Sequence, residues 1–187
     1  MQGVPRFKRI HAEEGHGTPL FSSADVMRTR FIPSALLSPK RNAREINICR
    51  VDEGTILVPC SGTYGGILGR AVRVGKYLHE KAITQHVVRV KVTDKRFNVD
   101  YVTGILSSLH VGYPMITAFR YGKDVPEIDP RDIATMPIPL LDKKDQERFA
   151  CLIQQGWAAI DDANYIQDEA QMSLCDALKI PTEYELI

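Results

Sequence analysis

Apolar side chains recur at steps of three and four residues along the last quarter of the chain, which predicts one face of a long helix. Asp142 is a candidate N-cap, and Asp145 places negative charge in the first turn, where the helix dipole favours it. The predicted buried face consists of Phe149, Ile153, Trp157, Ile160, Ala163, Ile166, Ala170, Leu174 and Leu178.

A helix that continues to Lys179 is about 55 Å long at about 1.5 Å per residue, which is longer than a small domain is wide. Such a helix cannot bury its whole apolar face on its own domain, so we expect it to pack against a second helix. Two ordinary helices, with a break at Gly156 or near Gln171, are the alternative that the pattern leaves open.

The earlier part of the chain shows the patterns of short strands. Residues 82–92 form the clearest predicted strand, because β-branched residues dominate and Arg89 and Lys91 alternate with valines. Residues 55–58 form a short apolar strand after a glycine turn, and residues 20–27 are an extended segment with polar interruptions.

A helix is predicted from a cap at Asn98 or Asp100 to about Leu109, where Gly112 ends it. Its expected buried stripe is Val102, Ile105, Leu106 and Leu109.

Asp129 followed by Pro130 predicts a short helical turn that reaches about Thr135. Residues 136–140 contain two prolines, which forbid both a helix and a central strand, so this segment is expected to be extended. The fold class is therefore α+β. A mixed, small-sheet domain with short helices spans residues 1–141, and a long C-terminal helix region spans residues 142–187.

Length and composition agree with one domain plus an appendage. The chain has 187 residues, of which 44% are hydrophobic, enough for a core. No run of 18 apolar residues occurs and residues 1–6 have no apolar signal region, so neither a membrane span nor secretion is expected. The four cysteines form no CxxC pair, which predicts reduced thiols in a cytoplasmic protein.

The near-neutral total charge conceals two unlike parts. Residues 1–120 hold 18 lysines and arginines against 9 acidic residues, whereas residues 121–187 hold 6 against 14. The first part therefore has a net charge of +9 and the second of −8. A basic region of this kind suits a polyanion such as nucleic acid, although scattered solvated charges are the simpler alternative.

A glycine-rich loop follows the strand at residues 55–58. Glycines at 62, 65 and 66 let the backbone adopt positive φ and approach another molecule closely. Ser61, Thr63 and Tyr64 add hydroxyl groups and an aromatic face. The loop is therefore a candidate contact surface.

The motifs of an enzyme are missing or weak. The glycine loop lacks the Gly-Lys-Ser/Thr ending of a phosphate loop, and no Asn/Asp-Pro-Pro-Tyr/Phe methyltransferase motif occurs. Cys60 with His79 or His86 as base is an alternative, but a free cysteine at a strand end more often serves packing. A metal site at His11, His16 and the glutamates at 13 and 14 is a further alternative with poor spacing. We expect no catalysis, cofactor or metal.

Four segments, in this order, resemble the target recognition domain of DNA-specificity subunits of type I restriction–modification systems. They are an early glycine and strand (Gly17 to Val26), a strand and glycine loop (Gly54 to Gly65), Leu106-Ser107-Ser108 in the middle helix, and Ile133 to Leu140 leading to Gln146.

This resemblance implies a non-catalytic subunit that binds duplex DNA and carries DNA methyltransferase subunits and, in some assemblies, restriction subunits. Residues 1–141 then form the DNA target recognition domain. Family subunits usually contain two such domains joined by two long helices, so one domain and one helix look like a half-subunit or a fragment. The helix partner is then a second copy, in a homodimer, or the second half of the same subunit.

The mechanism expected is sequence-selective duplex binding. Phosphate contacts supply most of the affinity, and the candidates are Arg28, Arg30, Lys40, Arg41, Arg44, Arg70, Arg73, Lys76 and Lys81. Base edges are read by side chains that make directional bonds, and the candidates are Ser61, Thr63 and Tyr64, on a loop that Gly62 shapes, together with Gln85 and Arg44. A non-catalytic RNA- or protein-binding module on the same scaffold is the alternative.

Overall fold

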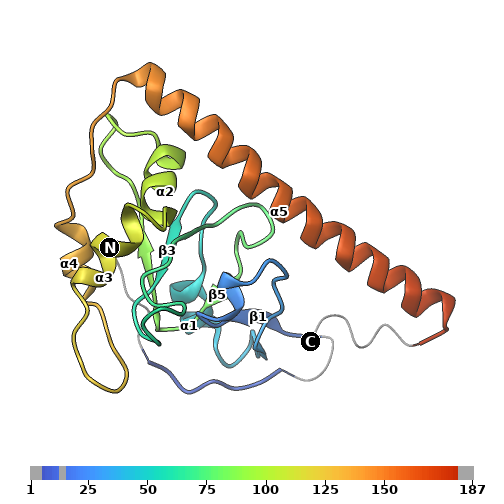
Figure 1. Ribbon diagram of the computed structural model, residues 1–187. Coiled ribbons are helices and arrows are strands. Elements are labelled where there is room, and N and C mark those ends of the chain that lie inside the picture. Colours follow the sequence, from blue (N-terminus) through green and yellow to red (C-terminus); the bar gives the residue numbers. More distant parts are fainter. Residues whose placement is uncertain (1–5, 13–15, 181–187) are drawn as a thin grey trace.

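Two small sheets form the body of the protein, and one long helix lies along its side (Figure 1). The structure, a computed structural model, describes residues 6–12 and 16–180. In the first sheet, β1 (Thr18–Phe21) pairs antiparallel with β2 (Ala35–Leu37) and parallel with β5 (Ala82–Ile83). In the second sheet, β3 (Ile56–Pro59) pairs antiparallel with β4 (Val72–Arg73) and with β6 (Val87–Val90).

The helices connect and cover these sheets. α1 (Ala43–Cys49) and the 3-10 turn η1 (Asp25–Met27) accompany the first sheet. α2 (Val99–Ser107), α3 (Gly112–Ala118) and α4 (Pro130–Ala134) follow the second, and α5 spans Lys143–Ala177. The α+β class with a long C-terminal helix is therefore confirmed. No helix in the described part of the chain is long and apolar enough to cross a membrane.

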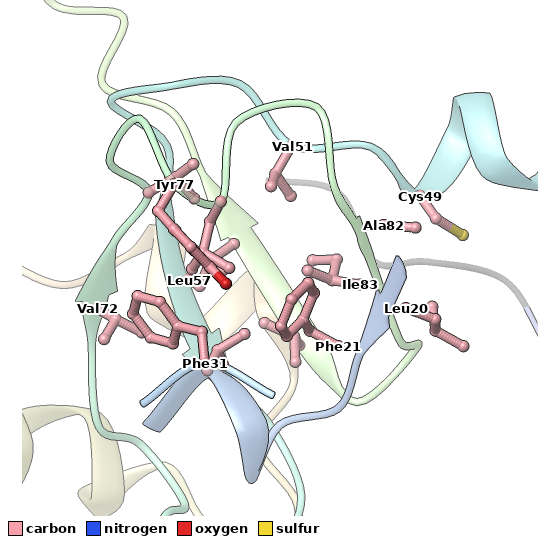
Figure 2. Packing of buried hydrophobic residues seen from close by; sticks show 14 of the residues in the cluster. Leu20, Phe21, Phe31, Cys49, Val51, Leu57, Val72, Tyr77, Ala82 and Ile83 are labelled. Carbon is pink, nitrogen blue, oxygen red and sulfur yellow. The ribbon is translucent and has the colours of Figure 1, made fainter. Parts of the chain in front are cut away.

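The central strand β3 is buried on both faces. Leu57 belongs to the core between the two sheets, together with Phe21, Phe31 and Ile83 (Figure 2). The neighbouring residues Ile56 and Val58 point the other way, into a second core that α2 and α3 cover. This two-sided burial explains why residues 55–58 form an unbroken apolar run rather than an alternating one.

The predicted strand at residues 82–92 is wrong as a single element. Ala82 and Ile83 pair with β1, whereas Val87 to Val90 pair with β3 in the other sheet. Thr84, whose amide donates to Phe21 O at 3.0 Å, lies where the chain leaves the first sheet. Both strands are rich in β-branched residues, so local pattern alone could not show that they belong to different sheets.

The extended segment predicted at residues 20–27 ends early. β1 stops at Phe21, and the next residues form a turn. The carboxylate of Asp25 accepts hydrogen bonds from Ser22 N at 2.8 Å and from Ser22 Oγ at 2.7 Å, which closes this turn.

α2 begins as predicted, because the Asn98 side chain caps it by accepting from Asp100 N at 2.8 Å. It ends two residues earlier than expected, and Leu109 is exposed rather than buried. Gly112 begins α3 instead of ending the earlier helix. Its Cα packs so closely on the backbone of Ile105 and Leu106 that a side chain would collide there, which explains the glycine.

The capping predictions for the last two helices are confirmed. The Asp129 carboxylate accepts from Arg131 N at 2.8 Å, and the Asp142 carboxylate accepts from Asp145 N at 2.9 Å. Hydrogen bonding to the Arg131 side chain also lowers the pKa of Asp129 to about 2. Residues 136–140, between the two helices, form neither helix nor strand.

α5 is one continuous helix of 35 residues, so the two-helix alternative is wrong. Its N-terminal half packs on α2, and its C-terminal end extends past the body (Figure 1). Ile153, Trp157 and Ile160 are half-buried, whereas Phe149, Ile166, Leu174 and Leu178 are exposed. The predicted single buried face is therefore covered only in part. Residues 181–187 of the predicted helix region lie outside the described residues.

Candidate nucleic-acid interface

The glycine loop after β3 depends on backbone conformations that side chains disfavour. Gly65 has φ of +82° and Gly69 has φ of +74°. A side chain at Gly69 would also press on Thr117 of α3, 2.9 Å from the position of its Cβ. The loop is thus held close to α3, and Gly65 N donates to the Tyr113 hydroxyl at 3.1 Å.

A second loop, residues 120–127, lies against the glycine loop. Ile128 N donates to Cys60 O at 2.8 Å, and Gly62 N donates to Pro126 O at 3.3 Å. The guanidinium carbon of Arg120 lies 4.2 Å from the centre of the Tyr64 ring, in a cation–π contact. Tyr64 keeps 52% of its surface exposed. The two loops therefore present a stacked cation and aromatic ring to solvent.

A chain of polar side chains lies beside this stack. Ser61 Oγ is 2.8 Å from His86 Nδ1, Gln85 Nε2 is 3.3 Å from His86 Nε2, and Arg9 Nη2 donates to Gln85 Oε1 at 3.1 Å. These contacts follow from the sheet register, because Pro59 at the end of β3 lies opposite Val87 at the start of β6. Residues just after β3 and just before β6 therefore meet.

We call Ser61, Tyr64, Gln85, His86 and Arg120 the recognition surface. It combines neutral donors and acceptors, an exposed aromatic ring and a cation, the set that reads base edges and contacts phosphates. The loop at residues 120–127 lies on the side of the body away from α5 (Figure 1). Ser61, Tyr64 and Gln85 were predicted from the sequence as DNA contacts, whereas His86, Arg120 and Arg9 were not, because their proximity to these residues depends on pairing between distant segments.

Thr63, also predicted to read bases, is exposed in the same loop. Most predicted phosphate contacts are also accessible. Lys40, Arg41, Arg44, Arg70 and Lys76 are exposed, and their side chains make no hydrogen bond or ion pair within the described ranges. Lys81 is half-buried, and Arg28 faces Asp25 at 3.8 Å. These cations sit on several different elements, and Arg70 and Lys81 are the ones closest in sequence to the recognition surface.

Arg73 is engaged inside the protein. Its side chain is only 10% exposed and forms ion pairs with Asp100 and, at 3.9 Å, with Glu53. This is a different role from the predicted phosphate contact.

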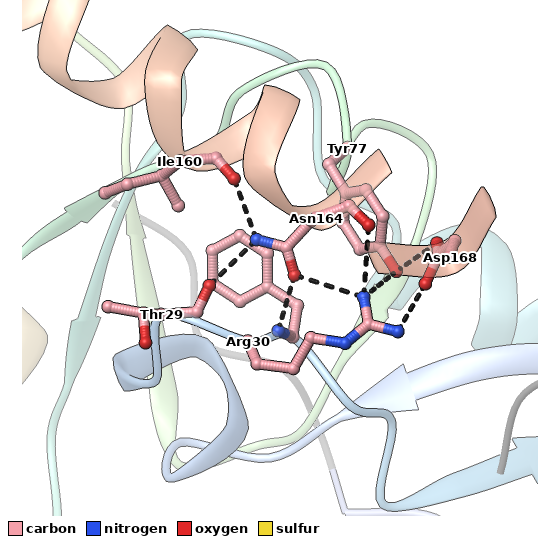
Figure 3. Close-up of polar contacts among 7 residues, drawn as sticks. Thr29, Arg30, Tyr77, Ile160, Asn164 and Asp168 are labelled. Atoms are coloured by element: carbon pink, nitrogen blue, oxygen red, sulfur yellow. Dashed lines mark hydrogen bonds and ion pairs between the residues drawn. The ribbon is translucent and has the colours of Figure 1, made fainter. Parts of the chain in front are cut away.

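Arg30 is likewise engaged, in a cluster that fastens α5 to the body (Figure 3). Its guanidinium pairs with Asp168 and donates to the Asn164 carbonyl at 3.3 Å. The Tyr77 hydroxyl donates to Asp168 Oδ2 at 2.9 Å, and burial together with this bond raises the pKa of Tyr77 to about 12. We call Arg30, Tyr77, Asp161, Asn164 and Asp168 the helix clamp.

Asp161 completes the clamp through the backbone. Its carboxylate accepts from Lys76 N at 2.7 Å, against Gly75, where any side chain would collide with the carboxylate. Burial raises the pKa of Asp161, although hydrogen bonds from the Lys76 and Tyr77 amides oppose this. Near the start of α5, buried Gln146 accepts from Asn98 N at 2.9 Å and donates to Arg96 O at 3.0 Å. Directional hydrogen bonds therefore attach α5 to the body both near its start, at Gln146, and at the helix clamp.

The geometry gives little support to the enzyme alternatives. Burial raises the pKa of Cys60, which disfavours the nucleophilic thiolate. The two ring nitrogens of His86 are hydrogen-bonded to Ser61 and Gln85, and His79 Nδ1 accepts from Glu53 N at 3.2 Å. Within residues 6–12 and 16–180 no cluster suited to a metal ion occurs, and the glutamates at 13 and 14 lie outside the described residues.

Comparison with known proteins gives a likeness in fold. No family model matches the chain, and no curated protein matches it. Among solved structures, the type I restriction–modification system S subunit from M. genitalium is similar, with a TM-score of 0.54 and 15% sequence identity. The match covers 81% of this chain and 34% of that one, so this chain spans about a third of the S subunit's length. The expected recognition-domain fold is thus supported at the level of backbone architecture.

Proposed function

We propose that this chain is a DNA-specificity module of a restriction–modification complex. In this role it binds duplex DNA sequence-selectively, carries no catalysis of its own, and directs methyltransferase and restriction subunits to their target in the cytoplasm. The observation that carries the proposal is the recognition surface, where the Tyr64–Arg120 stack adjoins Ser61, His86 and Gln85. The fold likeness to an S subunit supports it.

The chemistry of this surface fits base reading. Arg120 is held over Tyr64, so its planar group is oriented before DNA arrives, and arginine makes bidentate bonds to guanine edges in the major groove. Gln85 offers the matching amide for adenine. Exposed cations such as Arg44 and Arg70 add sequence-independent phosphate contacts, which make binding fall with salt.

A mobility-shift comparison tests the proposal. The full chain is titrated with a pool of random duplex DNA, the same strands unpaired, and duplex RNA, and bound duplexes are selected and sequenced. We expect duplex DNA to bind best and the selected pool to converge on a short motif. Preference for RNA, or binding without convergence, would favour the RNA-binding alternative or a non-specific role.

The partner for α5 is proposed from a second apolar stripe, which we call the seam. It consists of Phe149, Leu152, Gly156, Ala159, Ala163, Ile166 and Ala170, all of them exposed. The steps alternate three and four residues, which is the heptad spacing of paired helices. The seam lies about a third of a turn around the helix from Ile153, Trp157 and Ile160, which face the body.

The seam is complementary to itself in an antiparallel pair. Aligning two copies so that Phe149 faces Ile166 also places Leu152 opposite Ala163 and Gly156 opposite Ala159. The small central residues let the two helices approach closely, and space around Gly156 is open. In this register Arg148 of each copy and Glu169 of the other flank the seam on the same side, two residues from direct opposition, and carry opposite charges.

We therefore propose that α5 pairs with a second copy of this chain, or with an equivalent helix in the second half of a longer subunit. An antiparallel pair sets two recognition surfaces at opposite ends. Such an assembly reads a DNA site in two parts, separated by a spacer that the helix length determines. Methyltransferase subunits would dock on the remaining helical and acidic surface.

A further inference from the structure

A basic pocket lies at the far end of the β3–β6 pair from the recognition surface. It has a volume of about 660 Å³ and is lined by Asn47, Arg50, Asp52, Arg89 and Lys91, among others. Ile56 pairs with Val90 at this end, whereas Pro59 pairs with Val87 at the other. The pocket is therefore separate from the loops that make up the recognition surface.

The charges in the pocket favour an anion. Three cations line it against one carboxylate, Asp52, which already pairs with Lys91. The hydrogen bond from Lys91 lowers the pKa of Asp52, so this carboxylate stays ionised and neutralises only one of the three cations. Arg50 is exposed, and its side chain has no hydrogen-bond or ion-pair partner in the described part of the chain.

Arg89 is held in place but not fully satisfied. Its Nη1 donates to the carbonyls of Ile48 at 2.7 Å and Arg50 at 3.2 Å, which caps the C-terminal end of α1. Its Nε is buried and has no hydrogen-bond partner among the described residues. A buried donor without an acceptor is costly, and Arg89 lines the pocket, so a shift of its guanidinium toward an acceptor bound there would be favourable.

We propose that this pocket binds a phosphate group, either one of a nucleic-acid backbone or a free phosphate. A phosphate offers several acceptor oxygens, which suits cations that converge from the residue after α1, from β6 and from the residue after β6. Arg50 and Lys91 supply charge at the rim, the fixed Arg89 supplies directional donors, and the Asn47 amide adds a neutral donor. This site goes beyond the proposed reading of bases and does not depend on it.

The first arm of the test uses inorganic phosphate. Amide resonances of the full chain are followed by NMR during titration with phosphate at constant ionic strength, with chloride as the balancing anion. We expect saturable shifts centred on residues 47–52 and 89–91, weakened at least about tenfold in Arg50→Gln and unchanged in Lys144→Gln, an exposed cation on α5. Arg89→Lys keeps the charge but removes the Nε donor, and it should also weaken phosphate binding.

The second arm distinguishes the source of the phosphate. For a backbone phosphate, Arg50→Gln should reduce the slope of log affinity for duplex DNA against log salt by about 0.9, whereas Lys144→Gln should not. Saturable phosphate shifts with an unchanged slope would identify a free phosphate as the ligand. Absence of saturable shifts in the wild-type chain, or an Arg50→Gln chain that titrates like wild type, would overturn the site. A chain that binds no DNA at all would refute the proposed function, but the phosphate titration would still decide the pocket.

Discussion

Asn164 of α5 uses its side-chain amide to bond the backbone on either side of Arg30, much as a neighbouring strand would. Phe31 N donates to Asn164 Oδ1 at 2.8 Å, and Asn164 Nδ2 donates to Thr29 O at 2.8 Å (Figure 3). Asn164 is completely buried. A directional contact of this kind determines both the rotation and the axial position of α5 on the body.

Replacing this amide should therefore be costly. Asn164→Leu is expected to lower the free energy of unfolding by about 2–4 kcal/mol, because it leaves a buried amide and a carbonyl without partners. Gln167→Leu, at an exposed position on the same helix, should change it by less than about 0.5 kcal/mol. Urea unfolding followed by circular dichroism measures both. Equal effects of the two substitutions would show that the Asn164 bonds do not hold the helix.

The clamp should also make stability depend on pH through Asp161. Its pKa in the folded protein is raised above the ordinary 3.8 by burial, so the unfolded state loses this proton first as the pH rises. Asp161 therefore contributes stability below about pH 3.8 that is lost at higher pH. Asp161→Asn should gain stability relative to wild type as the pH rises from 3 to 7.

Thermal unfolding of wild type and Asp161→Asn across this pH range measures the difference in their stability. The contributions of the other titrating groups, which both proteins share, cancel in this difference. A difference that does not change with pH would mean that the carboxylate has the same pKa in both states. A difference that falls as the pH rises would mean that the backbone amides of Lys76 and Tyr77 outweigh burial and stabilise the ionised form.

The recognition surface should affect DNA selectivity more than folding. Tyr64→Ala is expected to reduce the ratio of specific to non-specific DNA affinity by about tenfold, because it removes a stacking face and releases Arg120. Tyr64→Phe keeps the ring and should behave like wild type. Competition binding with the selected duplex and a scrambled one measures the ratio. A lower melting temperature with an unchanged ratio would make Tyr64 a packing residue instead.

The seam predicts a rescue by charge exchange. Arg148→Glu alone should weaken self-association, because the new glutamate then lies near the partner copy's Glu169, and this repulsion occurs twice in the symmetric pair. The double variant Arg148→Glu with Glu169→Arg should restore the association. Ala159→Glu, at the crowded centre, should abolish it. Analytical ultracentrifugation measures the association. A wild-type chain that stays monomeric at high concentration would exclude self-pairing and leave only a partner helix in a longer subunit.

The elements predicted correctly from the sequence are those that local interactions determine. Asn98, Asp129 and Asp142 each cap a helix through a bond to an amide two or three residues ahead, so short motifs were enough to place those helix starts. The prediction of a single strand at residues 82–92 failed for the opposite reason. These residues divide between two sheets, and strand partners more than 25 residues away in sequence decide where the division falls.

The long helix shows the same limit. Steps of three and four residues identified it, but they merged two stripes, one led by Ile153 and the other by Phe149. Only contact with the body, through Asp161 and Asn164, shows which stripe is covered. The candidate site follows this rule too, since glycines revealed the loop while Arg120 reaches it from a distant segment.

The two-sided burial of β3 has a consequence for how the protein comes apart. Because Leu57 belongs to one core and Ile56 and Val58 to the other, neither core can melt while its neighbour stays intact. The body should lose structure in a single cooperative step, and the amides of β3 should exchange with solvent only through that global opening. The glycine loop begins at the end of this most protected strand, so its glycine-dependent shape has a rigid base.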